Sequence, residues 1–275
     1  GDAGRSDAGA AMTLCAETRG AGAELVLLHG WGLHSGIWGG IVDDLARRWR
    51  VTCIDLPGHG RSPLTDARDL DAFAGQVAAA APPRAMWLGW SLGGMVAMKI
   101  AAAQPERVER LALVAANPRF VQGDDWPYGV APEVLAQFSQ NLEQDYRGTL
   151  LRFLALEAMG GDRSKEELRL LRQGVFERGE PRPEALRTGL EILHDADLRP
   201  LLPALRCPTL LIYGERDRLV SRRAGPVAAG TMRDATMHVI RGAAHAPFLS
   251  HPDEFLQVLE EFLDSGHGSC HDGRA

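Results

Sequence analysis

Short apolar runs alternate with amphipathic stretches along most of the chain. The apolar runs predict buried strands, at 25–28, 51–54, 85–88, 111–114, 209–213 and 237–240. Helical spacing of apolar positions between them predicts helices, at 37–49, 70–81, 92–104 and 252–263. Strands that alternate with helices in this way predict an α/β fold, with a mostly parallel central sheet and helices on both faces.

One long stretch departs from this alternation. From 119 to 195 there is no clear strand, only helical patterns such as 134–141, 149–159 and 164–175. We therefore expect a core in two parts, with 119–195 inserted between them as a helical cap over the strand ends. The two core parts and the two flexible termini that we expect are 12–118, 196–264, 1–11 and 265–275.

Composition narrows the class of protein. The chain has 275 residues, 45% apolar and 24% charged, which are ordinary values for a globular protein. Its net charge of −6 argues against general nucleic-acid binding. No apolar run reaches membrane-spanning length, and no signal peptide is evident. The four cysteines are scattered and predict no disulfide framework, so a reducing cytoplasmic location is expected, with no membrane partner.

The segment Gly89-Trp90-Ser91-Leu92-Gly93 carries the strongest chemical signal. It joins a predicted strand to a predicted helix and has the G-x-S-x-G form of a nucleophile elbow. So abrupt a turn strains the residue at its corner. Gly89 and Gly93 lack the side chains that would clash as strand and helix close on each other. We therefore predict that Ser91 is a nucleophile at the carboxyl end of the sheet, where such sheets bind ligands.

A nucleophilic serine needs a base and an acid that orients the base. In a sheet with this elbow they follow in the order serine, acid, histidine. His245, in a loop after the last predicted strand, is the predicted base. Asp217 is the predicted acid, and Glu215 in the same loop is the alternative. His238 lies within a strand pattern and His251 begins the last helix, so packing or capping explains them better.

The chemistry also needs two main-chain N–H groups to hold an oxyanion. Leu92, directly after the nucleophile, is predicted to supply one of them. Trp31, in the glycine-flanked turn after the strand 25–28, is predicted to supply the other. His29 precedes Ser91 in the chain, so we interpret it as a structural residue of that turn.

With these residues in place, the chain resembles the α/β-hydrolases over nearly its whole length. The matching motifs are Leu28-His29-Gly30-Trp31-Gly32, Asp55-Leu56-Pro57-Gly58-His59-Gly60-Arg61-Ser62, the elbow, Asp217 and His245. Within that fold it is similar to the BioH-type esterases of biotin synthesis, in segments 89–94, 152–156, 189–193 and 243–248. This resemblance implies hydrolysis of the methyl ester of pimeloyl-acyl-carrier protein, with release of methanol and with no metal or other cofactor.

The same resemblance implies a partner and two groups of binding residues. Basic cap residues would hold the acidic acyl carrier protein, and they are Arg147, Arg152, Lys165 and Arg169. Lys165 and Arg169 share a helical face with Arg172, although an ordinary solvated face would have the same pattern. An apolar channel for the acyl chain would be lined by Trp31, Leu33, Trp90, Phe138 and Phe153, any of which could equally serve packing.

Two other functions remain open on the sequence alone. One is a general carboxylesterase or thioesterase for short acyl chains, which would use the same residues. The other is a small-molecule receptor that keeps the fold without turnover. A dehalogenase or epoxide hydrolase is disfavoured because those enzymes usually have Asp where this chain has Ser91. The protein is expected to act as a monomer.

Overall fold

A computed structural model describes residues 13–265 of the chain. The expected flexible ends, 1–11 and 265–275, lie outside this range except for Ser265. The tail residues His267, Cys270 and His271 are three potential metal ligands, for which the sequence alone predicts no metal site, and they also lie outside the described residues.

The centre of the molecule is a sheet of seven strands in the order β1-β3-β2-β4-β5-β6-β7. The strands are β1 (Ala16–Arg19), β2 (Glu24–Leu28), β3 (Arg50–Ile54), β4 (Ala85–Trp90), β5 (Val108–Val114), β6 (Thr209–Gly214) and β7 (Ala235–Ile240). All neighbours pair in parallel except β1 and β3. The predicted α/β fold with a mostly parallel sheet is confirmed, and each of the six predicted runs lies within a strand.

The seventh strand, β1, was not predicted. It pairs antiparallel with β3 at the edge of the sheet, and none of its four residues is buried. An edge strand with little buried surface has no continuous apolar run, so hydrophobic patterning gives no signal for it.

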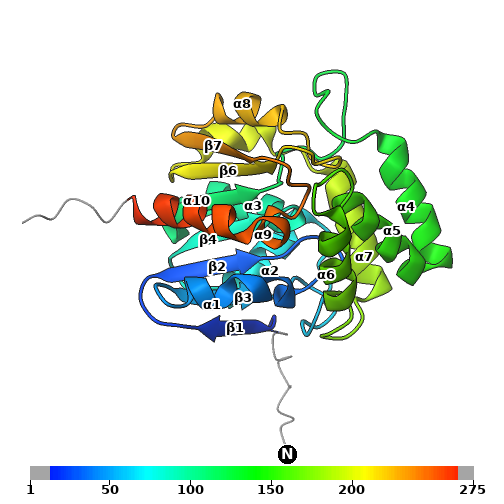
Figure 1. The fold of residues 1–275 in the computed structure, drawn as a ribbon, viewed down its shortest axis with the longest axis horizontal. Helices are drawn as coiled ribbons and strands as arrows, with labels where there is room; N and C mark the ends of the chain where they lie inside the picture. The colour runs from blue at the N-terminus through cyan, green and yellow to red at the C-terminus, as the bar shows by residue number, and fades with distance from the viewer. Residues whose placement is uncertain (1–12, 266–275) are drawn as a thin grey trace, which may run out of the picture.

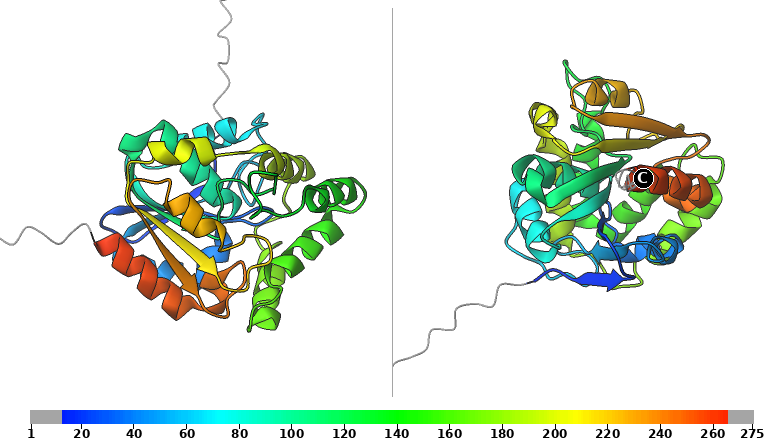
Figure 2. Two further views of the ribbon diagram at one scale, coloured as in Figure 1. Left: turned by 90° about the horizontal axis from the view of Figure 1, so that it is seen from above. Right: turned by 90° about the vertical axis from the view of Figure 1, so that its left-hand side faces the viewer.

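Helices cover both faces of this sheet. The α-helices are α1 (Val42–Leu45), α2 (Leu70–Ala80), α3 (Leu92–Ala103), α4 (Pro132–Gln144), α5 (Tyr146–Glu157), α6 (Ser164–Gly174), α7 (Pro183–Asp195), α8 (Ala224–Ala229), α9 (Pro247–Ser250) and α10 (Pro252–Asp264). Residues 13–265 also include the 3₁₀ helices η1 (Ser35–Gly40), η2 (Pro105–Arg107) and η3 (Arg199–Ala204). Figure 1 shows α1 and α10 on the near face, and the right-hand view of Figure 2 shows the sheet between them and α2 and α3.

The prediction of one continuous helix over 37–49 is wrong. The structure has the 3₁₀ helix η1 there, followed by the four-residue helix α1. Gly39 and Gly40 stand at the break, and each lies in open space where no packing would reward a helical turn. Two adjacent glycines lower helix propensity enough to interrupt the pattern of apolar residues around them.

Helices α4 to α7 lie between β5 and β6 in the sequence and gather at one end of the sheet (Figure 1). That is the end where β2, β4, β5 and β6 terminate, so these helices cover the carboxyl edge of the parallel strands. Isolated bridges join Val121 to Val130 and Gly123 to Trp126 before α4 begins. The cap boundaries at 119 and 195 stay a prediction from the sequence. Every helix within residues 13–265 is too short or too polar to traverse a lipid bilayer.

Candidate active site

Ser91 lies at the corner between β4 and α3, with a φ of 54° and a ψ of −118°. This positive φ is unfavourable for a residue with a side chain, so the surrounding structure must hold it. The Ser91 N–H donates a 2.9 Å hydrogen bond to the carbonyl of Val114 on β5. The Ser91 carbonyl accepts one from the N–H of Gly94, also at 2.9 Å. The strain expected of a nucleophile elbow is therefore present and is supported from both sides.

The elbow also requires glycine on both sides of the serine. A Cβ at Gly89 would lie 2.6 Å from the carbonyl oxygen of Gly93. A Cβ at Gly93 would lie 2.4 Å from the carbonyl oxygen of His29. Real Cβ atoms do not approach backbone so closely, so only glycine lets α3 pack this tightly on β2 and β4.

His245 and Asp217 form a fully buried pair. His245 Nδ1 lies 2.8 Å from Asp217 Oδ2, and neither side chain has exposed surface. The other carboxylate oxygen, Oδ1, accepts hydrogen bonds from the N–H groups of Leu219 and Val220 at 2.8 and 3.0 Å. Burial lowers the pKa of His245, but the charge and hydrogen bond of Asp217 outweigh it, so the pKa is raised above its ordinary value.

The second ring nitrogen of His245 is free to act. Nε2 is buried and has no hydrogen-bond partner within residues 13–265. An imidazole that is held by a carboxylate at one nitrogen and free at the other can take a proton from a hydroxyl. The indole N–H of Trp90, next to Ser91, donates a 2.8 Å hydrogen bond to the His245 carbonyl. Trp90 thus connects the elbow that carries Ser91 to the loop that carries His245, whose side chain contacts Asp217.

Glu215, the alternative acid, lies elsewhere in the same loop. Its Oε2 accepts a 3.0 Å hydrogen bond from the N–H of Gly242. It therefore joins the loop after β6 to the turn after β7, whereas Asp217 is the carboxylate that contacts His245.

The predicted oxyanion donors are available. Within the described chain, neither the Trp31 N–H nor the Leu92 N–H donates a hydrogen bond to another residue. Leu92 begins α3, where main-chain N–H groups have no partner within the helix. Two free, buried donors beside a strained serine can stabilise a negatively charged oxygen.

His29 supports the turn that carries Trp31. Its Nε2 accepts a 2.9 Å hydrogen bond from the Leu56 N–H, so Nδ1 carries the proton and donates to the Gly30 carbonyl at 2.8 Å. Burial lowers the pKa of His29 to about 3, which keeps the ring neutral. These contacts match the structural role expected for His29.

The five residues predicted to line an acyl channel are all buried. Trp31 and Phe153 have ring centroids 4.7 Å apart, and those of Phe153 and Phe138 are 5.3 Å apart, so core and cap aromatics form a continuous row. Trp90 packs instead against Phe248, at 5.1 Å between centroids. Leu33 joins the same hydrophobic core. The row of Trp31, Phe153 and Phe138 is the better candidate for an acyl-chain wall.

The four predicted docking residues lie on two neighbouring cap helices, and all are exposed. Arg147 and Arg152 are on α5. Arg147 pairs with Glu180 at 3.0 Å, and Arg152 lies 3.7 Å from Asp145. Lys165 and Arg169 are on α6 and form no ion pair with any residue from 13 to 265.

Two buried carboxyl groups beside His245 were missed by the sequence analysis. Glu157 on α5 and Glu167 on α6 have no exposed surface. Burial raises the pKa of each to about 8. A signal was present, because Glu167 precedes the buried Leu171 by four residues and Glu157 follows the buried Phe153 by four. Both therefore fall on the apolar stripe of their helices.

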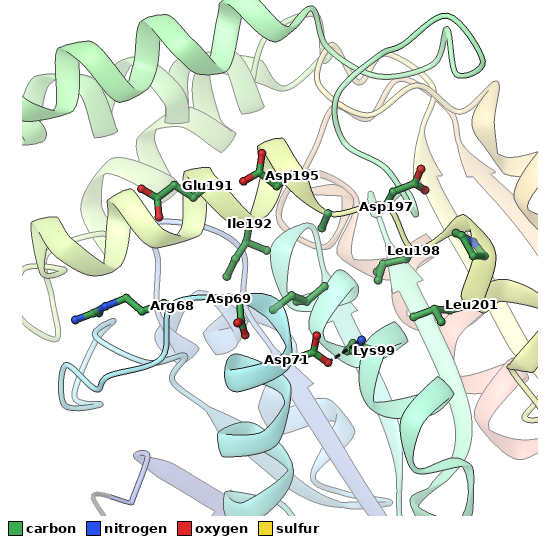
Figure 3. Close-up of a pocket in the computed structure, with 13 residues that line it drawn as sticks. Arg68, Asp69, Asp71, Lys99, Glu191, Ile192, Asp195, Asp197, Leu198 and Leu201 are labelled. Carbon is green, nitrogen blue, oxygen red and sulfur yellow. Dashed lines mark ion pairs between the residues drawn. The ribbon is translucent and has the colours of Figure 1, made fainter.

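A separate pocket of about 420 Å³ lies between the start of α2 and the end of α7 (Figure 3). Its acidic rim includes Asp69 and Glu191, and Lys99 in its wall pairs with Asp71 at 2.7 Å. None of the predicted site residues lines it. Among residues 13–265, no group of three or more His, Cys, Asp or Glu side chains is arranged to hold a metal ion.

Comparison with known proteins gives a consistent result. Residues 24–252 match the family described as alpha/beta hydrolase fold. A pimeloyl-[acyl-carrier protein] methyl ester esterase of Xanthomonas oryzae pv. oryzae is 47% identical over 251 residues, which are 90% of this chain and 97% of that protein. The esterase of the same name from Yersinia pseudotuberculosis is 45% identical, over 88% and 93% of the two chains.

Solved structures are similar over the same extent. An esterase from Exiguobacterium antarcticum superimposes with a TM-score of 0.80 and 23% sequence identity, over 92% of this chain and 96% of that one. At that identity the likeness supports the fold alone.

Proposed function

The chain belongs to the α/β-hydrolase family, and we propose that it is a serine carboxylesterase that hydrolyses the methyl ester of pimeloyl-acyl-carrier protein. Its products are methanol and pimeloyl-acyl-carrier protein with a free carboxylate. The proposal takes its substrate from the names of the relatives that are 45 to 47% identical.

The reaction proceeds by two acyl transfers. Ser91 attacks the ester carbonyl while His245 Nε2 takes the hydroxyl proton, and Asp217 stabilises the imidazolium that forms. The Trp31 and Leu92 N–H groups hold the negative oxygen of the tetrahedral intermediate. Methanol leaves with the proton from His245. Water then attacks the acyl-enzyme by the same route and restores Ser91.

One observation carries the chemical part of this proposal. Nδ1 of His245 is held by Asp217 at 2.8 Å while Nε2 is left buried and unpartnered within the described chain, at the edge where Ser91 has its strained φ. A receptor that never turned over its ligand would have no need of an unsatisfied buried nitrogen, which costs about 1–3 kcal/mol of stability.

We place carrier-protein docking on the exposed basic residues of α5 and α6. Acyl carrier protein is acidic, so positive side chains attract it at long range and salt weakens the attraction. Lys165 and Arg169 are free of ion pairs in the described chain, whereas Arg147 is paired with Glu180. Lys165 and Arg169 therefore have more charge available for a partner than Arg147.

The test is methanol release from methyl pimeloyl-acyl-carrier protein, beside hydrolysis of a short p-nitrophenyl ester, each at low and high salt. We expect a strong preference for the carrier-bound ester that weakens with salt. Lys165→Glu and Arg169→Glu should raise KM for the carrier-bound ester about tenfold relative to KM for the small ester.

Other outcomes separate the alternatives. Rapid hydrolysis of the small ester without any of the carrier-bound ester would support a general esterase and overturn the substrate assignment. Absence of hydrolysis together with failure of a fluorophosphonate to label Ser91 would support the receptor alternative.

We also propose that the enzyme acts in the cytoplasm. Cys15, Cys53 and Cys207 form no disulfide in the described chain, which suits a reducing compartment.

A further inference from the structure

The loop that carries His245 is hydrogen-bonded to the cap at three successive points. The N–H of Asp162, between α5 and α6, donates to the Gly242 carbonyl at 2.9 Å. The His245 N–H donates to the main-chain carbonyl of Glu157 at 3.1 Å. The Ala246 N–H donates to the carboxyl oxygen Oε1 of Glu167, also at 3.1 Å. The donors of two of these bonds are the proposed base, His245, and the next residue, Ala246.

The hydrogen bond from the His245 N–H to the Glu157 carbonyl also caps the carboxyl end of α5. Glu157 is the last residue of α5, where main-chain carbonyls have no partner within the helix. The His245 N–H supplies that partner from the other side of the active site. Cap helix and histidine loop are thus joined through main chain as well as through the Glu167 side chain.

The two glutamate side chains are buried in an unusual state. Both carboxyl oxygens of Glu157, and Oε2 of Glu167, are buried and have no hydrogen-bond partner within residues 13–265. The charged or titratable groups near both glutamates are His245 and Asp217, and Glu167 is also near Glu157. Ser250 lies beside Glu167. Burial of a carboxylate with few or no donors is costly, so burial favours the protonated form of both side chains.

We propose that Glu167, through its carboxyl group, and Glu157, through its main-chain carbonyl, are positioning residues of the hydrolytic reaction, which fasten the loop carrying His245 to α6 and α5. This inference rests on the proposed esterase function. It makes α5 and α6 part of the hydrolytic machinery, since they cannot lift from the core without breaking the hydrogen bonds that hold His245. An uncharged glutamate fills this place without adding a second negative charge beside Asp217.

Positioning matters here because His245 must serve both acyl transfers. It takes a proton from Ser91 and delivers it to methanol, and a displacement of about 1 Å can lower such a rate about a hundredfold. Loss of the Glu167 carboxyl frees the Ala246 N–H and the loop beside the base. The row of Trp31, Phe153 and Phe138, which is the candidate acyl-chain wall, makes none of these three hydrogen bonds, so kcat should change while KM does not.

The first experiment measures kcat and KM with a short p-nitrophenyl ester. Glu167→Ala should lower kcat about tenfold, the equivalent of one lost buried hydrogen bond, and leave KM within about twofold. Glu167→Gln keeps an oxygen that can accept from Ala246 and should recover most of that loss. Glu166→Ala, on the exposed side of the same helix, is the matched control and should retain the wild-type kcat.

The second experiment is the pH profile of kcat/KM between pH 6 and 9. Burial raises the pKa of Glu157 to about 8, so the wild type acquires a carboxylate beside His245 above that pH. A charge in this buried place draws water into the interface between the histidine loop and the cap, so kcat/KM should fall. Glu157→Gln has no ionisable group at that position, so its profile should fall less between pH 8 and 9.

The outcomes distinguish this inference from the proposed function. Absence of Ser91-dependent hydrolysis in the wild type, judged against Ser91→Ala, would overturn the proposed function itself. Ser91-dependent hydrolysis with unchanged kcat in Glu167→Ala and an identical alkaline limb in Glu157→Gln would overturn the inference alone. A Glu167→Ala variant that loses kcat without rescue by Glu167→Gln would also contradict it.

Discussion

The indole N–H of Trp90 donates a 2.8 Å hydrogen bond to the main-chain carbonyl of His245, a residue 155 positions further along the chain. Trp90 directly precedes Ser91, so this bond joins the nucleophile elbow to the histidine loop. The two rings also lie 5.7 Å apart between centroids, and Phe248 packs against Trp90 at 5.1 Å. Trp90 therefore holds the two halves of the site at a fixed separation.

Replacement of Trp90 by Phe should impair both stability and activity. The His245 carbonyl would lose its buried donor, so the free energy of unfolding should fall by about 1–3 kcal/mol. The loop would also be held less firmly, so kcat should fall about tenfold. Urea denaturation and p-nitrophenyl ester kinetics measure the two effects.

A matched control for this prediction is Trp126→Phe. The Trp126 indole N–H donates a comparable 2.9 Å bond to the Arg119 carbonyl, away from the catalytic residues. We expect that variant to lose stability and to keep its kcat. Equal losses of kcat in the two variants would contradict a positioning role for Trp90.

The central strands could be predicted because parallel strands are buried on both faces. All six residues of β4 and of β6 are buried, so each is an apolar run in the sequence. Edge strand β1 lies half in solvent and has no such run. The break between η1 and α1 depends on two glycines that a count of apolar positions does not weigh.

The positions of Ser91, Asp217 and His245 could be predicted because each follows a strand, and parallel strands end at one edge. The contact between His245 and Asp217 needed the structure. Glu157 and Glu167 could not be assigned in the same way, since glutamate in a helix is usually exposed. Glu166 and Glu167 are adjacent and chemically identical. Helical spacing puts Glu167 on the stripe of Leu171, but the structure was needed to show that this stripe packs against the histidine loop.

Gly93→Ala should disrupt the elbow. Its Cβ would lie 2.4 Å from the His29 carbonyl oxygen and 2.5 Å from that of Leu28, so backbone must shift at the nucleophile and at the oxyanion turn. We expect a loss of about 3 kcal/mol in the free energy of unfolding, as for a severely overpacked core. Hydrolysis should fall steeply in whatever fraction of the protein remains folded.

Gly75→Ala is the control for that substitution. Gly75 lies within α2, and a Cβ there would meet nothing within 4 Å. Alanine should therefore stabilise the helix by up to about 1 kcal/mol and leave hydrolysis unchanged. A Gly93→Ala variant as stable and active as Gly75→Ala would show that the elbow tolerates a side chain.

Asp217→Asn should show which of the two acidic residues in the loop after β6, Asp217 or Glu215, acts in catalysis. Asparagine cannot stabilise the imidazolium or hold His245 in the required tautomer, so kcat should fall about 10⁴-fold with little change in KM. Glu215→Gln keeps an oxygen that can accept from the Gly242 N–H, and its kcat should stay within about threefold of the wild type. The reverse order of the two effects would make Glu215 the catalytic acid.

Glu157 should make stability depend on pH in a characteristic direction. Its pKa is raised from 4.5 to about 8 in the folded protein because the carboxyl group is buried. Between these values the folded state keeps a proton that the unfolded chain has released. The stabilising effect of that proton is complete below about pH 4.5 and is lost as pH rises toward 8.

The slope from one such group approaches ~1.4 kcal/mol per pH unit within that window. Urea denaturation from pH 5 to 8.5 should therefore show the free energy of unfolding of the wild type falling more steeply with pH than that of Glu157→Gln. Groups that do not interact with Glu157 contribute equally to both curves, so the difference reports Glu157 together with the groups coupled to it, above all His245 and Glu167. Glu166→Gln removes an exposed carboxylate from the neighbouring helix, so its free energy of unfolding should change with pH as that of the wild type does. Parallel curves for the wild type and Glu157→Gln would mean that Glu157 is already ionised in the folded protein.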